Sequence, residues 1–328
     1  MIDRVIICGL RRAGNFVPEM EIRQMVGRGG RSYEKDAVGK VVILTSEEDY
    51  SVAEDYLYGK LPSILSKMDC IEDLAFHILP CIYSKEIYDD VTAYEWYRRT
   101  LAHLQSIQFP YRGVFNFLLS HEMIVGDDKQ FKITELGKLS CKYYFSPLYI
   151  YVWKEKFEKL MAGNAWNDNH AVAWALATND LGINVNKELM EMIEMNSYSS
   201  FEYDEKEQVA MYYCLFEGYR PKELKFAMME HRKDIDRIIK VLMSMNGIYK
   251  WGIFNEIEIL NVRIKERMDY NTARLALEIN IYNKSLLYKL SEFGIRTFED
   301  MKNNIDKIRT YGDKKMLEQL EETLNEFL

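Results

Sequence analysis

The side chains best suited to chemistry lie close together in residues 24–31. This stretch runs Gln-Met-Val-Gly-Arg-Gly-Gly-Arg and fits the pattern QxxGRxGR, with Arg28 and Arg31 three positions apart. Arginine keeps its charge and can donate two parallel hydrogen bonds to phosphate oxygens. An arginine aimed at a phosphoryl group in transfer stabilises the negative charge that develops on its equatorial oxygens. We therefore predict that Arg28 and Arg31 are catalytic residues of a phosphoryl-transfer site.

Glycines and a glutamine accompany the two arginines. Gly27, Gly29 and Gly30 lack a Cβ atom, so the backbone can pass close to another surface there. Gln24 stands four residues before Arg28, and we assign Gln24, Gly27 and Gly30 to nucleotide binding. The alternative is a surface loop whose arginines are merely solvated. The helix before the segment and the apolar run after it favour the site.

Two short apolar runs and a helix must position this segment. Residues 4–9 and 41–45 are apolar runs of the kind found in strands buried on both faces of a parallel sheet. Residues 18–26 between them predict a helix with Pro18 near its start. Strand, helix and strand form one α/β crossover. Because one crossover is not a whole sheet, we expect the other strands to be supplied from outside this chain.

From about residue 50 onward the pattern is helical, with one exception. Residues 111–124 predict a helix, residues 126–129 a turn, residues 131–134 a short strand, and the sequence from residue 135 a new helix. Helices followed by a small hairpin are typical of a winged helix.

The clearest amphipathic helix is predicted over residues 222–246. Its apolar stripe falls at positions 235, 238, 239, 242 and 245. Lys233, Arg237 and Lys240 form a short basic row on another face, suited to the phosphates of a single strand of nucleic acid. A solvated helix face is the alternative. Trp251 is either a base-stacking platform or, as we favour, a core residue at the helix end.

Composition narrows the class of protein. The net charge is −8, which counts against a protein that coats nucleic acid by bulk electrostatics. The five cysteines and five histidines are scattered without the spacing of a zinc site, so we expect no metal bound by this chain alone. No apolar run approaches the roughly 20 residues that cross a bilayer, so we expect no membrane partner and a cytoplasmic location.

Residues 24–31 resemble motif VI of superfamily II helicases, in the form found in the DExH Ski-two-like branch. That branch includes archaeal repair helicases and the helicase part of DNA polymerase theta. Further stretches resemble the same branch: residues 134–137 with 144–147 (TxLGxxxxxYxxxP), residues 231–238 (GDLxRI), and residues 263–265 with 294–300 (RIK…GI). The resemblance covers nearly the whole chain.

The resemblance implies an α+β fold that is mostly α, in four parts. Residues 1–60 would be the end of the second RecA-like helicase domain, a partial α/β edge. Residues 61–150 would be a winged-helix domain, and residues 151–282 a helical "ratchet" bundle. Residues 283–328 would form a degenerate tail like a helix-hairpin-helix. Ser244 stands near the place of the ratchet helix's stacking aromatic.

The resemblance also implies a function. The chain would be the carboxy-terminal portion of an ATP-dependent helicase that guides single-stranded DNA or RNA. ATP with Mg²⁺ would bind only together with an amino-terminal motor half, because the sequence contains neither GxGKT/S nor a DExH box. That half would be a separate chain or a lost upstream segment, and we do not expect this chain to hydrolyse ATP alone.

Two other functions remain open. One is a non-catalytic helicase remnant that acts as a nucleic-acid- or protein-binding module. The other, which we favour less, is a winged-helix transcription factor, but the sequence shows no obvious basic recognition helix.

Overall fold

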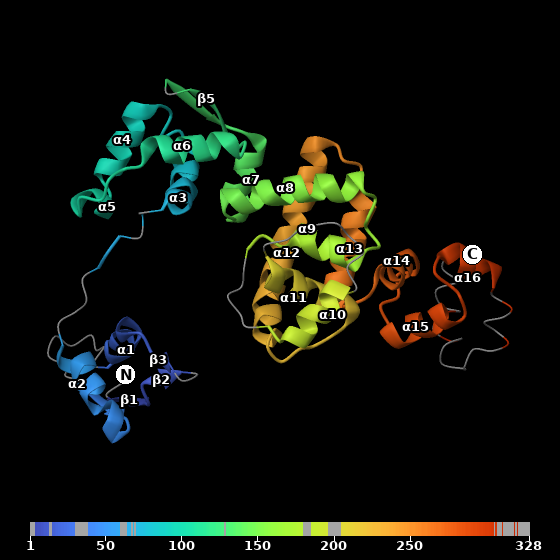
Figure 1. Ribbon diagram of the computed structural model, residues 1–328, viewed down its shortest axis with the longest axis horizontal. Coiled ribbons are helices and arrows are strands. Elements are labelled where there is room, and N and C mark those ends of the chain that lie inside the picture. Colours follow the sequence, from blue (N-terminus) through green and yellow to red (C-terminus); the bar gives the residue numbers. More distant parts are fainter. Residues whose placement is uncertain are drawn as a thin grey trace. The chain divides into compact units, whose positions relative to one another are not determined.

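The computed structural model describes residues 4–12, 15–29, 39–59, 64–66, 68, 70–127, 129–179, 185–195, 205–304, 306, 310, 318 and 320. The chain divides into an amino-terminal unit, Met1–Leu65, and a carboxy-terminal unit, Ser66–Leu328. Both are rich in helices, and the strands form only small two-stranded sheets (Figure 1). The predicted α+β, mostly α class is confirmed, whereas the predicted boundaries of the four parts stay predictions.

The amino-terminal unit contains the strand, helix and strand that the sequence predicts. Strand β1 (Arg4–Cys8) pairs in parallel with β4 (Lys40–Leu44), and helix α1 (Glu19–Val26) lies between them in sequence. Pro18 occupies the position before the helix, as expected. The other elements are β2 (Arg11–Arg12), β3 (Asn15–Phe16), a 3-10 helix η1 (Glu47–Asp49) and α2 (Tyr50–Tyr58).

The prediction that both strands are buried on two faces is wrong for this pair. Their side chains alternate, so that the Ile7 face packs into a small core while Ile6 and Leu44 are 59% and 55% exposed. That core contains Ile7, Leu10, Val17, Ile22 and Ala53, which come from β1, α1, α2 and the turns between them. Because residues i and i+1 of a strand point to opposite faces, helices on one side cover only alternate residues.

The carboxy-terminal unit is built almost entirely of helices. Its first elements are α3 (Ile71–Tyr83), α4 (Asp90–Arg98), α5 (Leu101–Leu104), α6 (Tyr111–Ser120), β5 (Ile124–Asp127), β6 (Gln130–Ile133), α7 (Glu135–Tyr143), α8 (Pro147–Ala162) and α9 (Asn169–Leu176). Its later elements are α10 (Lys187–Met195), α11 (Lys206–Glu217), α12 (Lys225–Tyr249), α13 (Phe254–Glu266), α14 (Tyr270–Ile279), α15 (Lys284–Glu292) and α16 (Phe298–Asn303). One core runs from α3 to α13, and a second lies among α13, α14, α15 and α16.

A small hairpin follows α6, as the pattern predicts, but α6 is shorter than predicted. The helix ends at Ser120 rather than continuing to Ile124, because Ile124 pairs with Ile133 in the antiparallel β5–β6 hairpin. Glu122 takes a positive φ of 57° in the turn between them. Side-chain pairing across the hairpin thus overrides the helical periodicity that extends through this apolar stretch.

Helix α12 bears out the predicted amphipathic helix, shifted by three residues. Its predicted apolar stripe is buried, from Ile235 to Met245. The helix ends where Lys250 adopts a left-handed conformation. Trp251 then stacks on Tyr249, with ring centroids 5.5 Å apart, and packs against the main core. This contact supports the interpretation of Trp251 as a core residue. No helix of the described residues is long and apolar enough to cross a membrane.

Candidate arginine site and candidate nucleic-acid interface

Three of the predicted site residues lie together at the end of α1. The Gly27 N–H donates to the Arg23 carbonyl at 2.9 Å, and the Arg28 N–H donates to the Met25 carbonyl at 3.0 Å. This keeps the helical turn going, so Gln24 and Arg28 sit one turn apart. Gln24, Gly27 and Arg28 line the same surface hollow, with a volume of about 330 Å³. Gly30 and Arg31 lie outside the described residues.

Arg28 and its neighbour Arg23 differ in their partners. Arg23 forms an ion pair with Glu19 and donates to the Gly59 carbonyl at 2.7 Å, so it ties α1 to the end of α2. Arg28 is exposed and makes no hydrogen bond or ion pair with any side chain that the structure describes. It also lines a second hollow of about 560 Å³ that runs along β1. An exposed arginine beside two hollows is available for a ligand.

Gly27 and Gly29 have room for a Cβ atom among the described residues of this unit. A Cβ atom added to Gly27 would lie 3.4 Å from the nearest atom, the Arg23 carbonyl oxygen. One added to Gly29 would lie 3.5 Å from the side chain of Val5. Both distances are ordinary contacts, and neither glycine has a positive φ. The role of these glycines against a surface from outside the described residues therefore stays a prediction.

An ion pair that the sequence does not predict holds the loop after β1. Arg11 donates two hydrogen bonds to the carboxylate of Asp49, at 2.9 and 2.8 Å. Its guanidinium also lies 3.9 Å from the ring centroid of Phe16. The hydrogen bonds from Arg11 lower the pKa of Asp49 below its ordinary value. The two residues are 38 positions apart, and no local pattern signals such a pairing.

The predicted basic row of α12 is largely neutralised by the acids of its own helix. Lys233 pairs with Glu230 at 2.7 Å, and Arg237 pairs with Asp234 one turn earlier. Lys240 is exposed and forms no ion pair with a described acidic residue. Lys233 and Arg237 would therefore have to leave these ion pairs, each worth about 1 kcal/mol or less, to bind a phosphate.

Arg237 is also fixed against the end of α7. It donates to the Tyr143 carbonyl at 3.3 Å, and its guanidinium lies 4.6 Å from the ring centroid of Phe145. These contacts are those of a side chain that joins two helices. The Tyr143 hydroxyl lies 3.0 Å from Ser244 Oγ, so the residue near the expected position of a stacking aromatic is hydrogen-bonded to another helix.

Tyr143 has an altered acidity at this junction. Burial acts to raise its pKa, but the hydrogen bond with Ser244 and the charges of Lys142 and Lys240 outweigh it, so the pKa is lowered.

Two residues of the 263–265 run have structural contacts. Arg263 is 1% exposed and donates to the Trp166 carbonyl at 2.9 Å and to the side chain of Asn169. Lys265 forms an ion pair with Asp236 of α12 at 2.7 Å. Both residues thus attach α13 to its neighbours. Among the described residues, no group of three histidines, cysteines or acids could hold a metal ion.

These features fit the carboxy-terminal half of a superfamily II helicase of the Ski-two-like branch, and comparison with known proteins confirms the resemblance. No family model matches the chain. The ATP-dependent DNA helicase Hel308 of Pyrococcus horikoshii is 26% identical over 336 aligned residues, covering 92% of this chain and 46% of the relative. Hel308 of Methanocaldococcus jannaschii is 24% identical over 97% of this chain and 28% of its own length. Hel308 of Pyrococcus abyssi is 31% identical over 48% of this chain and 23% of its own length. The chain thus spans about half, or less, of the curated relatives it matches.

Proposed function

We propose that this chain is the carboxy-terminal portion of an ATP-dependent DNA helicase and supplies the arginine side of its ATP site. Arg28 carries the proposal, because it is exposed, has no partner among the described side chains and shares a hollow with Gln24 and Gly27. The similarity to DNA helicases over most of the chain supports the same function and favours DNA over RNA.

In this proposal ATP with Mg²⁺ supplies the phosphoryl group that is transferred to water. Arg28 and Arg31 donate hydrogen bonds to the oxygens of that group as negative charge develops on them. Gln24 supports the helix that carries Arg28. A phosphate-binding loop and metal ligands come from an amino-terminal motor half, either another chain or another segment of the same protein.

Arg28 fits this role by its placement. It lies in the turn after α1, so its long side chain extends from a helix end that Arg23 and Glu19 brace. The braced helix end fixes the backbone from which the Arg28 side chain reaches the phosphate. Because no acidic side chain among the described residues pairs with Arg28, its charge is available to the ligand.

ATP hydrolysis in a mixture tests the proposal. The chain would be mixed with a front half from the source genome that carries GxGKT and DExH, with and without single-stranded DNA. We expect hydrolysis only in the mixture, and Arg28→Ala should lower kcat by about 10³-fold or more. The matched control is Lys40→Ala, which removes one exposed cation from the same unit outside both hollows.

The outcomes separate the alternatives. An Arg28→Ala variant that keeps kcat within a few-fold of the parent would refute the catalytic role of Arg28. DNA binding without hydrolysis in the mixture would favour the non-catalytic binding module instead.

A further inference from the structure

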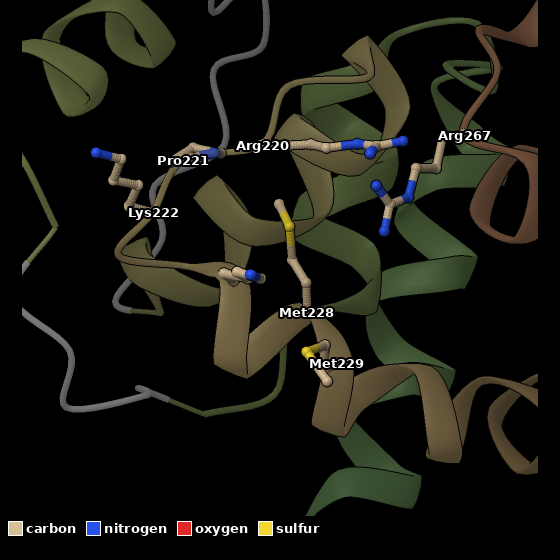
Figure 2. A pocket seen from close by; sticks show the side chains of 7 residues that line it. Arg220, Pro221, Lys222, Met228, Met229 and Arg267 are labelled. Carbon is tan, nitrogen blue, oxygen red and sulfur yellow. The ribbon is translucent and has the colours of Figure 1, made fainter.

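A pocket of the carboxy-terminal unit is lined by cations and methionines. It lies between the α11–α12 connection, the first turn of α12 and the end of α13, and has a volume of about 400 Å³. The side chains that matter are Arg220, Lys222, Lys225, Met228, Met229 and Arg267. Figure 2 shows the guanidinium groups of Arg220 and Arg267 turned toward each other above Met228. Every charged residue that lines the pocket is positive.

The cations of this pocket differ in their partners from those of the neighbouring helices. None of its four cations forms an ion pair with an acidic side chain among the described residues, in a chain whose net charge is −8. Lys233 and Lys265 of the neighbouring helices do have such partners. Burial lowers the pKa of Arg267, and repulsion from Arg220 and Arg232 lowers it further. Like charges kept together at such a cost indicate a site for an anion.

The backbone holds these cations in place. Arg267 adopts a left-handed conformation, with φ 56°, at the end of α13, and its carbonyl accepts a hydrogen bond from Lys284. Gly218 ends α11 with a positive φ of 76°, which starts the connection that carries Arg220. Leu224, fully buried, anchors the start of α12. Arginines 47 positions apart in sequence are thereby brought to one pocket.

Exposed aromatic and apolar side chains accompany the cations. Phe226, which follows Lys225 in the chain, is 72% exposed, whereas Tyr219, which precedes Arg220, lines a separate hollow with Asp168 and Glu217. Met229 is 59% exposed at the pocket itself. Cations for phosphates interleaved with aromatic rings for bases are the combination that binds single strands without sequence preference. A free phosphate ion would need the cations but not the rings.

We propose that this pocket binds backbone phosphates of single-stranded DNA and is the principal phosphate contact of the carboxy-terminal unit. The inference rests on the proposed helicase function but moves the contact away from the predicted row at Lys233, Arg237 and Lys240. That row is weakened by its own acidic neighbours, whereas the cations of the pocket keep their charge. Phe226, which follows Lys225 in the chain, then offers a stacking surface to an adjoining base.

The test is the binding of a fluorescent oligothymidylate to the full chain, followed by anisotropy over a range of salt concentrations. We expect Arg220→Gln with Arg267→Gln to weaken binding about ten-fold, and the slope of log affinity against log salt to fall by about 1.4, since each single-strand phosphate contact contributes about 0.7. Arg220→Lys with Arg267→Lys should restore most of the slope. The matched control, Lys159→Gln with Lys206→Gln, removes two exposed cations elsewhere in the same unit and should leave both values near those of the parent.

Each outcome bears on one of the two proposals. One result is that the Arg220→Gln and Arg267→Gln double variant binds like the parent, while Lys233→Gln with Lys240→Gln binds more weakly. This result overturns the pocket proposal and leaves the helicase proposal standing. An equal loss in the control pair also overturns it, because bulk charge then explains the effect. A parent chain that does not bind the oligonucleotide overturns the pocket, whereas the helicase proposal is still decided by hydrolysis in the mixture.

If the Arg220→Gln and Arg267→Gln double variant melts at a lower temperature than the parent, weaker binding could reflect unfolding rather than a lost contact. In that case Lys222→Gln with Lys225→Gln takes its place, since both lysines are exposed and line the same pocket. A loss of binding and slope then supports the pocket, and unchanged values overturn it.

Discussion

Arg263 gives the sharpest prediction about how the carboxy-terminal unit is held together. It is 1% exposed, and its guanidinium donates to the Trp166 carbonyl and the Asn169 side chain and lies 4.3 Å from the ring centroid of Phe216. Because Arg263 belongs to a run that resembles a helicase motif, it is a natural target for mutagenesis aimed at DNA binding. The structure predicts that Arg263→Ala acts on folding instead.

The expected loss follows from these contacts. Truncation leaves the buried Trp166 carbonyl and the half-buried Asn169 side chain without this donor, at about 1–3 kcal/mol each. It also removes two buried methylenes, Cγ and Cδ, at about 0.8 kcal/mol each and a cation–π contact worth about 1 kcal/mol. Part of this loss is offset, because the variant no longer buries the charged guanidinium of Arg263. Burial lowers the pKa of Arg263 from 12.5 to about 10, which corresponds to roughly 3 kcal/mol recovered. The balance is a destabilisation of about 4 kcal/mol.

Urea unfolding followed by tryptophan fluorescence measures this change. All five tryptophans lie in the carboxy-terminal unit, so the signal reports that unit alone. Lys265→Ala is the matched control, because this lysine is in the same helix but is half exposed and pairs only with Asp236, so its loss should cost less than about 1 kcal/mol. A change below about 1 kcal/mol for Arg263→Ala, or an equal change for both variants, would refute the reasoning.

Two further measurements use the same unfolding signal. Burial lowers the pKa of His231, so its unfolded state takes up a proton first. The free energy of unfolding should therefore be largest above about pH 6.5 and fall as the pH drops below it. In His231→Asn it should depend less on pH, and parallel profiles for the two proteins would contradict this. A Cβ at Gly137 would lie 2.2 Å from the Met123 carbonyl oxygen, so Gly137→Ala should destabilise the unit by about 2 kcal/mol. Gly247→Ala, with no atom within 4 Å of the new Cβ, should stabilise α12 by about 0.5–1 kcal/mol. If Gly137→Ala and Gly247→Ala changed the stability in the same direction, the packing described here would be contradicted.

Local patterns explain why much of the carboxy-terminal unit could be predicted from the sequence. The Thr134–Gly137 stretch resembles a helicase motif, and in the structure Thr134 caps α7 by accepting from the Gly137 N–H at 2.9 Å. Tyr144 ends that helix in a left-handed conformation, and Pro147 begins α8. Caps and turns involve residues three or four positions apart, so their signals survive in the sequence alone.

The arginine segment is of the same local kind. Gln24 and Arg28 are neighbours because a helix turn makes them so, and the sequence predicted both the helix and the strands around it. Exposure of one face of the β1–β4 pair was not predictable, because an apolar run has the same composition whether one face or both are covered.

By itself, then, the sequence determined the mostly helical class, the helix that carries Arg28 and the resemblance to a helicase. Only the tertiary structure decided which cations are free to bind. Arg237 looks like a phosphate ligand in sequence but is held by Asp234 and Phe145, whereas Arg220 and Arg267 look unremarkable and share a pocket whose charged lining residues are all positive. The physical reason is that the charge available to a ligand depends on every group within a few ångströms. Packing brings those groups together from distant parts of the chain.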